Sequence, residues 1–210
     1  MSRIKLEDIN VSEIIYDKML NIKSNGIREW PEVETEYNRY EATPYFALEK
    51  LFNQIKINSS DKFVDFGCGM GRVAFYVHHR FQIEVTGLEA NQDVYKELQT
   101  NYYKYKKVTQ HINANLEFKY VFAQDYFVDN RDNIFYFFNP FSISIFEMIV
   151  NNILKSYEKN KREMKIILFY PILQYRKYLL ERTPFKLINE VQISYDDLEH
   201  DKFNIYQLTL

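Results

Sequence analysis

The chain has 210 residues, of which 46% are hydrophobic and 17% aromatic, and its formal net charge is −2. This length predicts one domain, with room for an appendage and a sizeable core. The apolar content excludes an intrinsically disordered chain. The nearly balanced charge does not indicate a nucleic-acid partner, although it is compatible with a local basic patch.

Neither a disulfide, a membrane span nor a metal site is expected. Cys68 is the only cysteine, and no secretory-type apolar segment follows Met1, so a reducing cytoplasm is the expected location. The longest uncharged stretch, residues 134–146, is too short to cross a bilayer. The four histidines and the cysteine lack the close spacing of metal ligands.

The first part of the chain, residues 1–58, has no strand pattern and is expected to form a helical cap that faces the substrate. Asn10 and Glu13 are placed like a capping pair at the start of its first helix. Thr43 and Pro44 are typical of an N-cap followed by the first position of a second helix.

From residue 59 to residue 210, strand-like and helix-like runs alternate. This pattern predicts an α/β three-layer sandwich with a seven-stranded, mostly parallel sheet and helices on both faces. The last two strand-like runs leave no room for a crossover helix, so they predict a C-terminal antiparallel hairpin. The expected strands are residues 62–66, 83–88, 116–123, 133–138, 164–170, 185–194 and 203–210, and the expected helices are residues 71–80, 91–107, 142–157 and 172–182.

Gly67, Gly69 and Gly71 lie together between the first of these strands and the helix that follows it. Glycine accepts a positive φ and lets a ligand approach the main chain closely, and the N–H groups of the next helix can bind a polar or anionic ligand. The cluster is therefore typical of a nucleotide-type cofactor site. A dinucleotide fingerprint needs a glycine at position 72, which is Arg72, and no Gly-Lys-Ser/Thr of a P-loop follows.

Polar groups also follow the next three expected strands. Glu89 ends the second strand, where a carboxylate can accept hydrogen bonds from both ribose hydroxyls of a nucleoside. Asp125 follows the third strand, and Asn139, Pro140 and Phe141 follow the fourth. Because ligands of an open parallel sheet bind beyond the carboxyl ends of its strands, these groups are suited to one shared ligand.

The run from Val64 to Gly71 resembles the first motif of the class I S-adenosyl-L-methionine-dependent methyltransferases, and the likeness extends over residues 40–210, the final hairpin included. The resemblance implies a Rossmann-like methyltransferase that binds S-adenosyl-L-methionine. In this family the loop glycines pass the methionine moiety, and the acidic residue of the preceding strand helps to position it. The cofactor-binding residues implied here are Asp65, Gly67, Cys68, Gly69, Gly71, Glu89, Ala90, Asp125, Asn139 and Thr43.

The segment Asn139-Pro140-Phe141 partly resembles the Asn-Pro-Pro-Tyr/Phe motif of amino-group methyltransferases. In that motif the Asn side chain and the following carbonyl accept hydrogen bonds from the amino group, and the ring stacks on a planar acceptor. The resemblance favours a nitrogen acceptor. The alternative is a plain strand-to-helix turn in which Ser142 is the N-cap.

The stretch from Tyr40 to Tyr45 is similar to a segment of the non-SET histone-lysine methyltransferases and their bacterial relatives, which closes over the methionine end of the cofactor. The residues that line the site by this resemblance are Tyr40, Thr43 and Pro44, and those that could face the acceptor are Tyr37, Glu41 and Tyr45. The catalytic candidates are Tyr40, Asn139, Pro140 and Phe141.

Three functions are compatible with these features. The best supported is an S-adenosyl-L-methionine-dependent methyltransferase whose acceptor is a protein, a nucleic acid or a small molecule, with nitrogen favoured. A non-catalytic regulatory protein that binds the same cofactor would keep the same motifs. A dinucleotide-dependent oxidoreductase is disfavoured by Arg72 and by the hairpin. The sequence indicates neither the general base nor the oligomeric state.

Overall fold

The computed structural model describes residues 6–29 and 36–209, with side chains from residue 12 onward. The helices are α1 (Leu6–Leu20), α2 (Tyr45–Phe52), α3 (Arg72–Phe81), α4 (Gln92–Val108), the 3-10 turn η1 (Ala123–Asp125), α5 (Ile143–Lys159) and α6 (Leu173–Arg182). The strands are β1 (Lys62–Phe66), β2 (Glu84–Glu89), β3 (Leu116–Tyr120), β4 (Ile134–Phe138), β5 (Met164–Phe169), β6 (Lys186–Gln192) and β7 (Lys202–Leu208).

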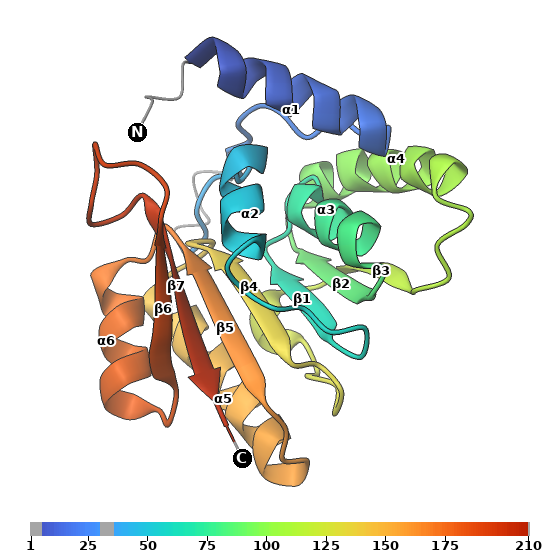
Figure 1. Cartoon of the computed structure of the whole chain (residues 1–210). Helices are drawn as coiled ribbons and strands as arrows, with labels where there is room; N and C mark the ends of the chain where they lie inside the picture. Colours follow the sequence, from blue (N-terminus) through green and yellow to red (C-terminus); the bar gives the residue numbers. More distant parts are fainter. Residues whose placement is uncertain (1–5, 30–35, 210) are drawn as a thin grey trace.

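Seven strands form one sheet in the order β3-β2-β1-β4-β5-β7-β6 (Figure 1). Strands β1 to β5 are parallel, whereas β7 is antiparallel to both β5 and β6. The expected sheet and its closing hairpin are therefore confirmed. The strand order reverses at β1, which has β2 on one side and β4 on the other, and a crevice beyond the carboxyl ends is expected there.

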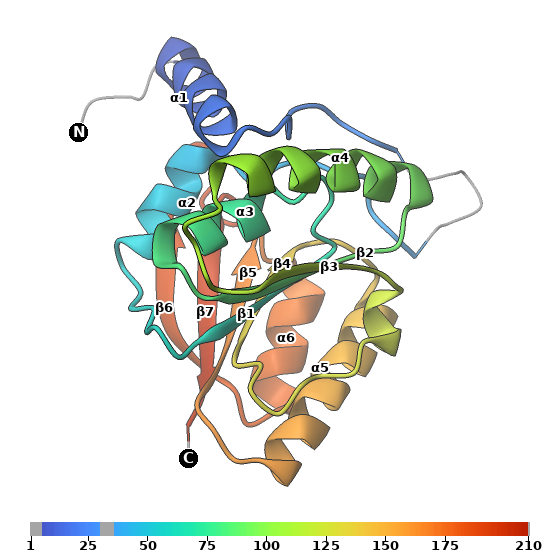
Figure 2. The same ribbon diagram turned by 90° about the vertical axis from the view of Figure 1, so that its right-hand side faces the viewer.

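Helices cover both faces of the sheet, which completes the expected three layers. Helices α2, α3 and α4 pack on one face, and α5 and α6 pack on the other (Figure 2). Side chains of β1 alternate between the two cores, with Phe63 on the first face and Val64 and Phe66 on the second. Leu48 of α2 lies in the same core as Phe63. The boundary at residue 58 stays a prediction.

Helix α1 differs from its expected start. It begins at Leu6, so Asn10 lies inside the helix and not at its N-cap position. Glu13 caps a different helix, since its carboxylate accepts a hydrogen bond from the backbone N–H of Tyr45 at 2.8 Å, in the first turn of α2. The capping expectation was wrong because a local sequence pattern does not show that α1 lies against α2, as it does in Figure 1.

Helix α2 also begins differently from its expected pattern. Its N-cap is Pro44, whose own side chain makes no capping hydrogen bond, and Thr43 precedes it. The Thr43 hydroxyl instead lies 2.7 Å from the Tyr136 hydroxyl of β4, inside the protein. In contrast, Ser142 is the N-cap of α5, as one reading of the sequence predicted.

Residues 36–44, which we call the strap, run irregularly across the carboxyl ends of the strands. Tyr37 forms an antiparallel bridge with Phe141, and Tyr40 forms one with Arg28. No periodic pattern predicted this element. The strap places a segment from before β1 over the crevice at the reversal of the strand order. Within residues 6–29 and 36–209, none of the helices has the length and apolar character that crossing a membrane requires.

Candidate active site

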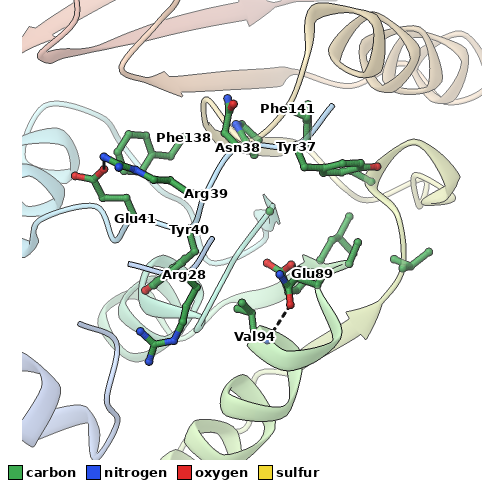
Figure 3. Close-up of a pocket in the computed structure, with 17 residues that line it drawn as sticks. Arg28, Tyr37, Asn38, Arg39, Tyr40, Glu41, Glu89, Val94, Phe138 and Phe141 are labelled. Carbon is green, nitrogen blue, oxygen red and sulfur yellow. Dashed lines mark hydrogen bonds and ion pairs between the residues drawn. The ribbon is translucent and has the colours of Figure 1, made fainter. Parts of the chain in front are cut away.

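A pocket lies at the carboxyl ends of β1, β2 and β4, and we call it the inner pocket. Gly67 and Pro140 contribute from the loops after β1 and β4, and Glu89 contributes from the end of β2. The strap covers it on the opposite side, as the row of labelled residues from Tyr37 to Glu41 shows (Figure 3). The remaining lining residues are Arg28, Leu88, Ala90, Asn91, Val94, Val121, Ala123, Phe138 and Phe141.

Glu89 is held in the wall of the inner pocket by backbone donors. The N–H groups of Gly69 and Asn91 donate to its two carboxylate oxygens at 2.9 Å and 2.7 Å. The side chain is buried, and burial raises its pKa. A carboxylate has about four lone-pair positions, so it can accept further hydrogen bonds from a ligand in the pocket.

Asp65 lies on β1 behind the glycine loop and is only 3% exposed. Its Oδ2 atom has no hydrogen-bond partner among the described residues. Burial, together with the nearby charge of Glu89, raises the pKa of this carboxyl to about 8, although a hydrogen bond from the backbone of Ala74 lowers it. An unpartnered buried acceptor is costly, so its position indicates a site for a donor or cationic group.

The glycine loop has the predicted positive φ values, +74° at Gly67 and +56° at Gly69. A Cβ atom on Gly67 would lie 2.7 Å from Cβ of Pro140, and one on Gly69 would lie 1.9 Å from a ring carbon of Tyr40. Glycine is therefore required at both positions for conformation and for space. The loop is in direct contact with the turn after β4 and with the strap.

The turn after β4 is bound to the strap through Asn38. The backbone N–H of Asn38 donates to the carbonyl of Pro140 at 3.0 Å, and its side chain donates to the carbonyl of Asn139 at 2.7 Å. Asn139 has a left-handed backbone with φ +40°, and its Oδ1 atom is buried without a partner among the described residues. Of the two acceptors that the amino-group motif implies, only the Asn139 side chain is thus unpartnered.

A second cavity lies on the other side of the strap, with a volume of about 720 Å³, and we call it the outer groove. Asn139 and Phe138 contribute from the end of β4, Tyr170 follows β5, and Asp201 precedes β7. Phe138 also lines the inner pocket, so the two cavities adjoin at the end of β4. The other lining residues are Glu29, Tyr37, Asn38, Arg39, Glu41, Ala42, Pro44 and Phe169.

The outer groove is acidic. Among the described residues, three carboxylates line it against one guanidinium, and that guanidinium, Arg39, lies 3.4 Å from Glu41 and 4.0 Å from Glu29. Asp201 has a cationic neighbour that does not line the groove, Lys50. Its partial burial raises its pKa, as does the negative charge of Asp197.

Tyr170 is strained at the rim of the outer groove. Its φ is +53°, which is rare for a residue with a bulky side chain. Its ring stacks on His200, with centroids 5.1 Å apart. Backbone strain of this kind persists where the surrounding structure enforces it, often at functional sites. The acidic run from residue 195 to residue 201 was the sequence signal that would have drawn attention to this rim.

The structure brings most of the predicted residues together, but not all. Those that line the inner pocket are Tyr40, Gly67, Glu89, Ala90, Pro140 and Phe141, and Asn139 lines the outer groove. Those that lie behind these surfaces are Asp65, Cys68, Gly69, Gly71 and Thr43. Tyr37 and Glu41 line both cavities, as expected of residues that could face an acceptor.

Two predicted placements are not met. Asp125 is exposed and lines neither cavity, because β3 ends at Tyr120 and the chain then turns through η1. Tyr45 is fully buried and its hydroxyl donates to Asp17 at 2.7 Å, so it does not face the outer groove. Burial raises the pKa of the Cys68 thiol well above its usual range, which makes it unreactive.

The reversed parallel sheet with its closing hairpin, the glycine loop after β1 and the carboxylate at the end of β2 define a class I S-adenosyl-L-methionine-dependent methyltransferase. The family model of the histone methylation protein DOT1 matches residues 16–189. The chain therefore belongs to the DOT1 family, and it is an enzyme that uses S-adenosyl-L-methionine.

Solved structures share this fold at low sequence identity. An RNA methyltransferase from Salinibacter ruber in complex with S-adenosyl-L-homocysteine is 14% identical, with a TM-score of 0.54 over 80% of this chain and 94% of that one. A methyltransferase from Methanosarcina mazei is 16% identical, with a TM-score of 0.53 over 73% and 95%. An rRNA methylase from Streptococcus thermophilus is 12% identical, with a TM-score of 0.51 over 81% and 99%. No sequence among the curated proteins matches the chain.

Proposed function

We propose that this methyltransferase acts on an amine nitrogen of a basic protein whose side chain enters the outer groove. The observation that carries the proposal is the position of Asn139. Its unpartnered Oδ1 lies where an acidic groove adjoins the inner pocket. An amide oxygen there can accept a hydrogen bond from an amine, and the carboxylates attract a cationic acceptor.

The inner pocket is the proposed site of S-adenosyl-L-methionine, and the residues present fit it. Glu89 accepts hydrogen bonds from the ribose hydroxyls. The Asp65 carboxyl, whose Oδ2 is unpartnered, lies next to the glycine loop for the methionine end, and it keeps acceptor capacity even when it is protonated. When bound, the cofactor supplies an electrophilic methyl group on a sulfonium centre.

The residues around the outer groove align and desolvate the acceptor. Methyl transfer needs the nitrogen lone pair in line with the methyl carbon at about 3 Å, and a hydrogen bond to Asn139 restricts that orientation. Tyr37, Phe138 and Tyr170 present aromatic surface that excludes water and favours a cation. The amine must lose its proton to become a nucleophile, and Asp201 and Glu41 are the carboxylates placed to receive it.

The charge of the outer groove favours a protein acceptor over RNA. Carboxylates at the rim repel phosphates, whereas RNA-binding surfaces present Lys and Arg. Among the relatives, the matching family is described by histone methylation and several solved structures by RNA methylation. For this chain, the three described carboxylates of the outer groove support a protein acceptor.

The test is a competition between acceptors. The protein is incubated with methyl-labelled S-adenosyl-L-methionine and equal masses of a histone mixture and a mixed RNA preparation. We expect label in protein, lost in Asn139→Ala but retained in the control Asn130→Ala, an exposed residue at the opposite end of the sheet. Label in RNA would overturn the acceptor assignment. Label in neither protein nor RNA would also overturn the assignment, in favour of a small-molecule acceptor.

A further inference from the structure

Arg72 is a buried cation in an unfavourable place. It is the first residue of α3, directly after the glycine loop, and is 3% exposed. A positive charge at a helix N-terminus opposes the helix dipole, and a buried guanidinium must be fully paired to be tolerated. Helix α3 would therefore form more readily with a neutral residue at this position.

Among the described residues, the partners of Arg72 all come from the N-terminal segment, residues 1–58. Its Nε donates to the Ser24 hydroxyl at 2.7 Å, and a terminal nitrogen donates to the Thr43 carbonyl at 3.2 Å. Glu13 and Asn25 bind its two terminal nitrogens. The guanidinium thus joins α1, the segment after it and the strap to the helix that follows the glycine loop.

Ser24 connects this network to the inner pocket. Its hydroxyl donates to Asp17 at 2.6 Å while it accepts from Arg72, so its position is fixed from two sides. Its carbonyl accepts a hydrogen bond from the Tyr40 hydroxyl at 2.7 Å. The Tyr40 ring lies directly on Gly69. A continuous chain of contacts therefore runs from Arg72 through Ser24 and Tyr40 to the glycine loop.

Tyr40 forms part of the cover of the inner pocket in Figure 3. With the ring on Gly69, the cavity volume is about 50 Å³, below the roughly 300–1,000 Å³ of small-molecule pockets. A ligand the size of S-adenosyl-L-methionine therefore needs the strap to lift before it can enter or leave. The contacts that keep the Tyr40 ring on Gly69 therefore control both the entry and the release of the ligand.

We infer that Arg72 is a positioning residue that, through Ser24 and the Thr43 carbonyl, holds Tyr40 and the strap closed over the cofactor site. The inference rests on the proposed placement of S-adenosyl-L-methionine in the inner pocket. Because the contacts stabilise the closed strap with and without ligand, weakening them accelerates entry and release by a similar factor. The dissociation constant then changes little. General damage to the site would instead raise the dissociation constant, so the two cases can be distinguished.

The test measures both rate constants by surface plasmon resonance with S-adenosyl-L-methionine as the analyte. Arg72→Lys keeps the positive charge but loses the planar guanidinium group with its several N–H donors. We expect it to raise the association and dissociation rate constants by about tenfold each. A change of that size corresponds to the loss of roughly one charge-assisted hydrogen bond. Tyr40→Phe removes the hydroxyl that binds Ser24 and has a similar effect. The rate constants of the double variant are expected to be close to those of each single variant, because both substitutions break the same chain of contacts.

Arg80→Lys is the matched control. It lies on the same helix, and its guanidinium binds the Tyr76 hydroxyl at 2.6 Å and Asn53 at 2.8 Å, away from the inner pocket. We expect it to lower the melting temperature without changing either rate constant. If Arg72→Lys does not fold, Ser24→Ala removes the same junction and is expected to accelerate both steps.

Unchanged rate constants in a folded Arg72→Lys or Ser24→Ala variant would overturn the inference, as would independent, multiplicative effects of Arg72→Lys and Tyr40→Phe. Glu89→Ala separates this outcome from failure of the proposed placement. If the placement is right, Glu89→Ala weakens binding whatever Arg72 does. If Glu89→Ala binds with wild-type affinity, the placement itself is wrong.

Discussion

The Asp65 carboxyl makes the stability of the fold depend on pH in a way that one substitution removes. Burial raises its pKa from 3.8 to about 8. Since the pKa is higher in the folded state, that state binds the proton more tightly between these two values. The contribution of Asp65 to stability is therefore full below the unfolded pKa and is lost as the pH rises through the folded pKa.

The magnitude follows from linkage. One group that is protonated in the folded state and ionised in the unfolded state changes the free energy of unfolding by about 1.4 kcal/mol per pH unit. Between about pH 5 and about pH 7, Asp65 therefore removes at most about 2.8 kcal/mol. Asp65→Asn has no proton to lose at this position, so its stability relative to the wild type improves by up to that amount over the same range.

The assay is urea unfolding of both proteins at several pH values across this range. The difference between the two proteins is the informative quantity, because burial lowers the pKa of His78, which gives both proteins an opposite slope. Asp196→Asn, an exposed carboxylate, is the control and should follow the wild type. If Asp65→Asn and the wild type show the same pH dependence, the assignment of a buried, protonated Asp65 is wrong.

Two further substitutions test the contacts around the site. Gly69→Ala places a Cβ atom 1.9 Å from the Tyr40 ring at a positive φ, so we expect a lower melting temperature, and a wild-type melting temperature would refute the contact. Tyr170→Gly relieves the strain of φ +53° and is expected to raise the free energy of unfolding by about 1 kcal/mol. The same substitution removes aromatic surface from the outer groove, so the KM for a protein acceptor should rise while the KM for the cofactor stays constant. A lower free energy of unfolding in Tyr170→Gly would argue against backbone strain at this position.

The parts of the site that the sequence predicted are those in which local pattern decides position. Glycines after a buried strand require a positive φ, and Gly67 and Gly69 have it. Glu89 ends a strand parallel to β1, so topology alone brings it to the same edge of the sheet. Each inference needed only neighbouring residues and the rule that parallel strands end together.

The parts that the sequence did not predict depend on contacts between distant segments. The bridge between Tyr37 and Phe141 has no periodic signal, because the strap is neither helix nor regular strand. Thr43 resembles a helix cap locally, but the hydroxyl of Tyr136 binds it in the folded protein. Asp201 directly precedes β7, the last strand of the sheet, and only the hairpin of β6 and β7 returns it to the outer groove.

The central claim is that S-adenosyl-L-methionine lies in the inner pocket with its methyl group directed toward the outer groove. A crystal structure with S-adenosyl-L-homocysteine tests it most directly. The account predicts a ribose within hydrogen-bond distance of Glu89 and a sulfur atom on the side of Asn139, beneath the strap. A ligand bound elsewhere, or a sulfur atom directed away from Asn139 and the outer groove, would contradict it.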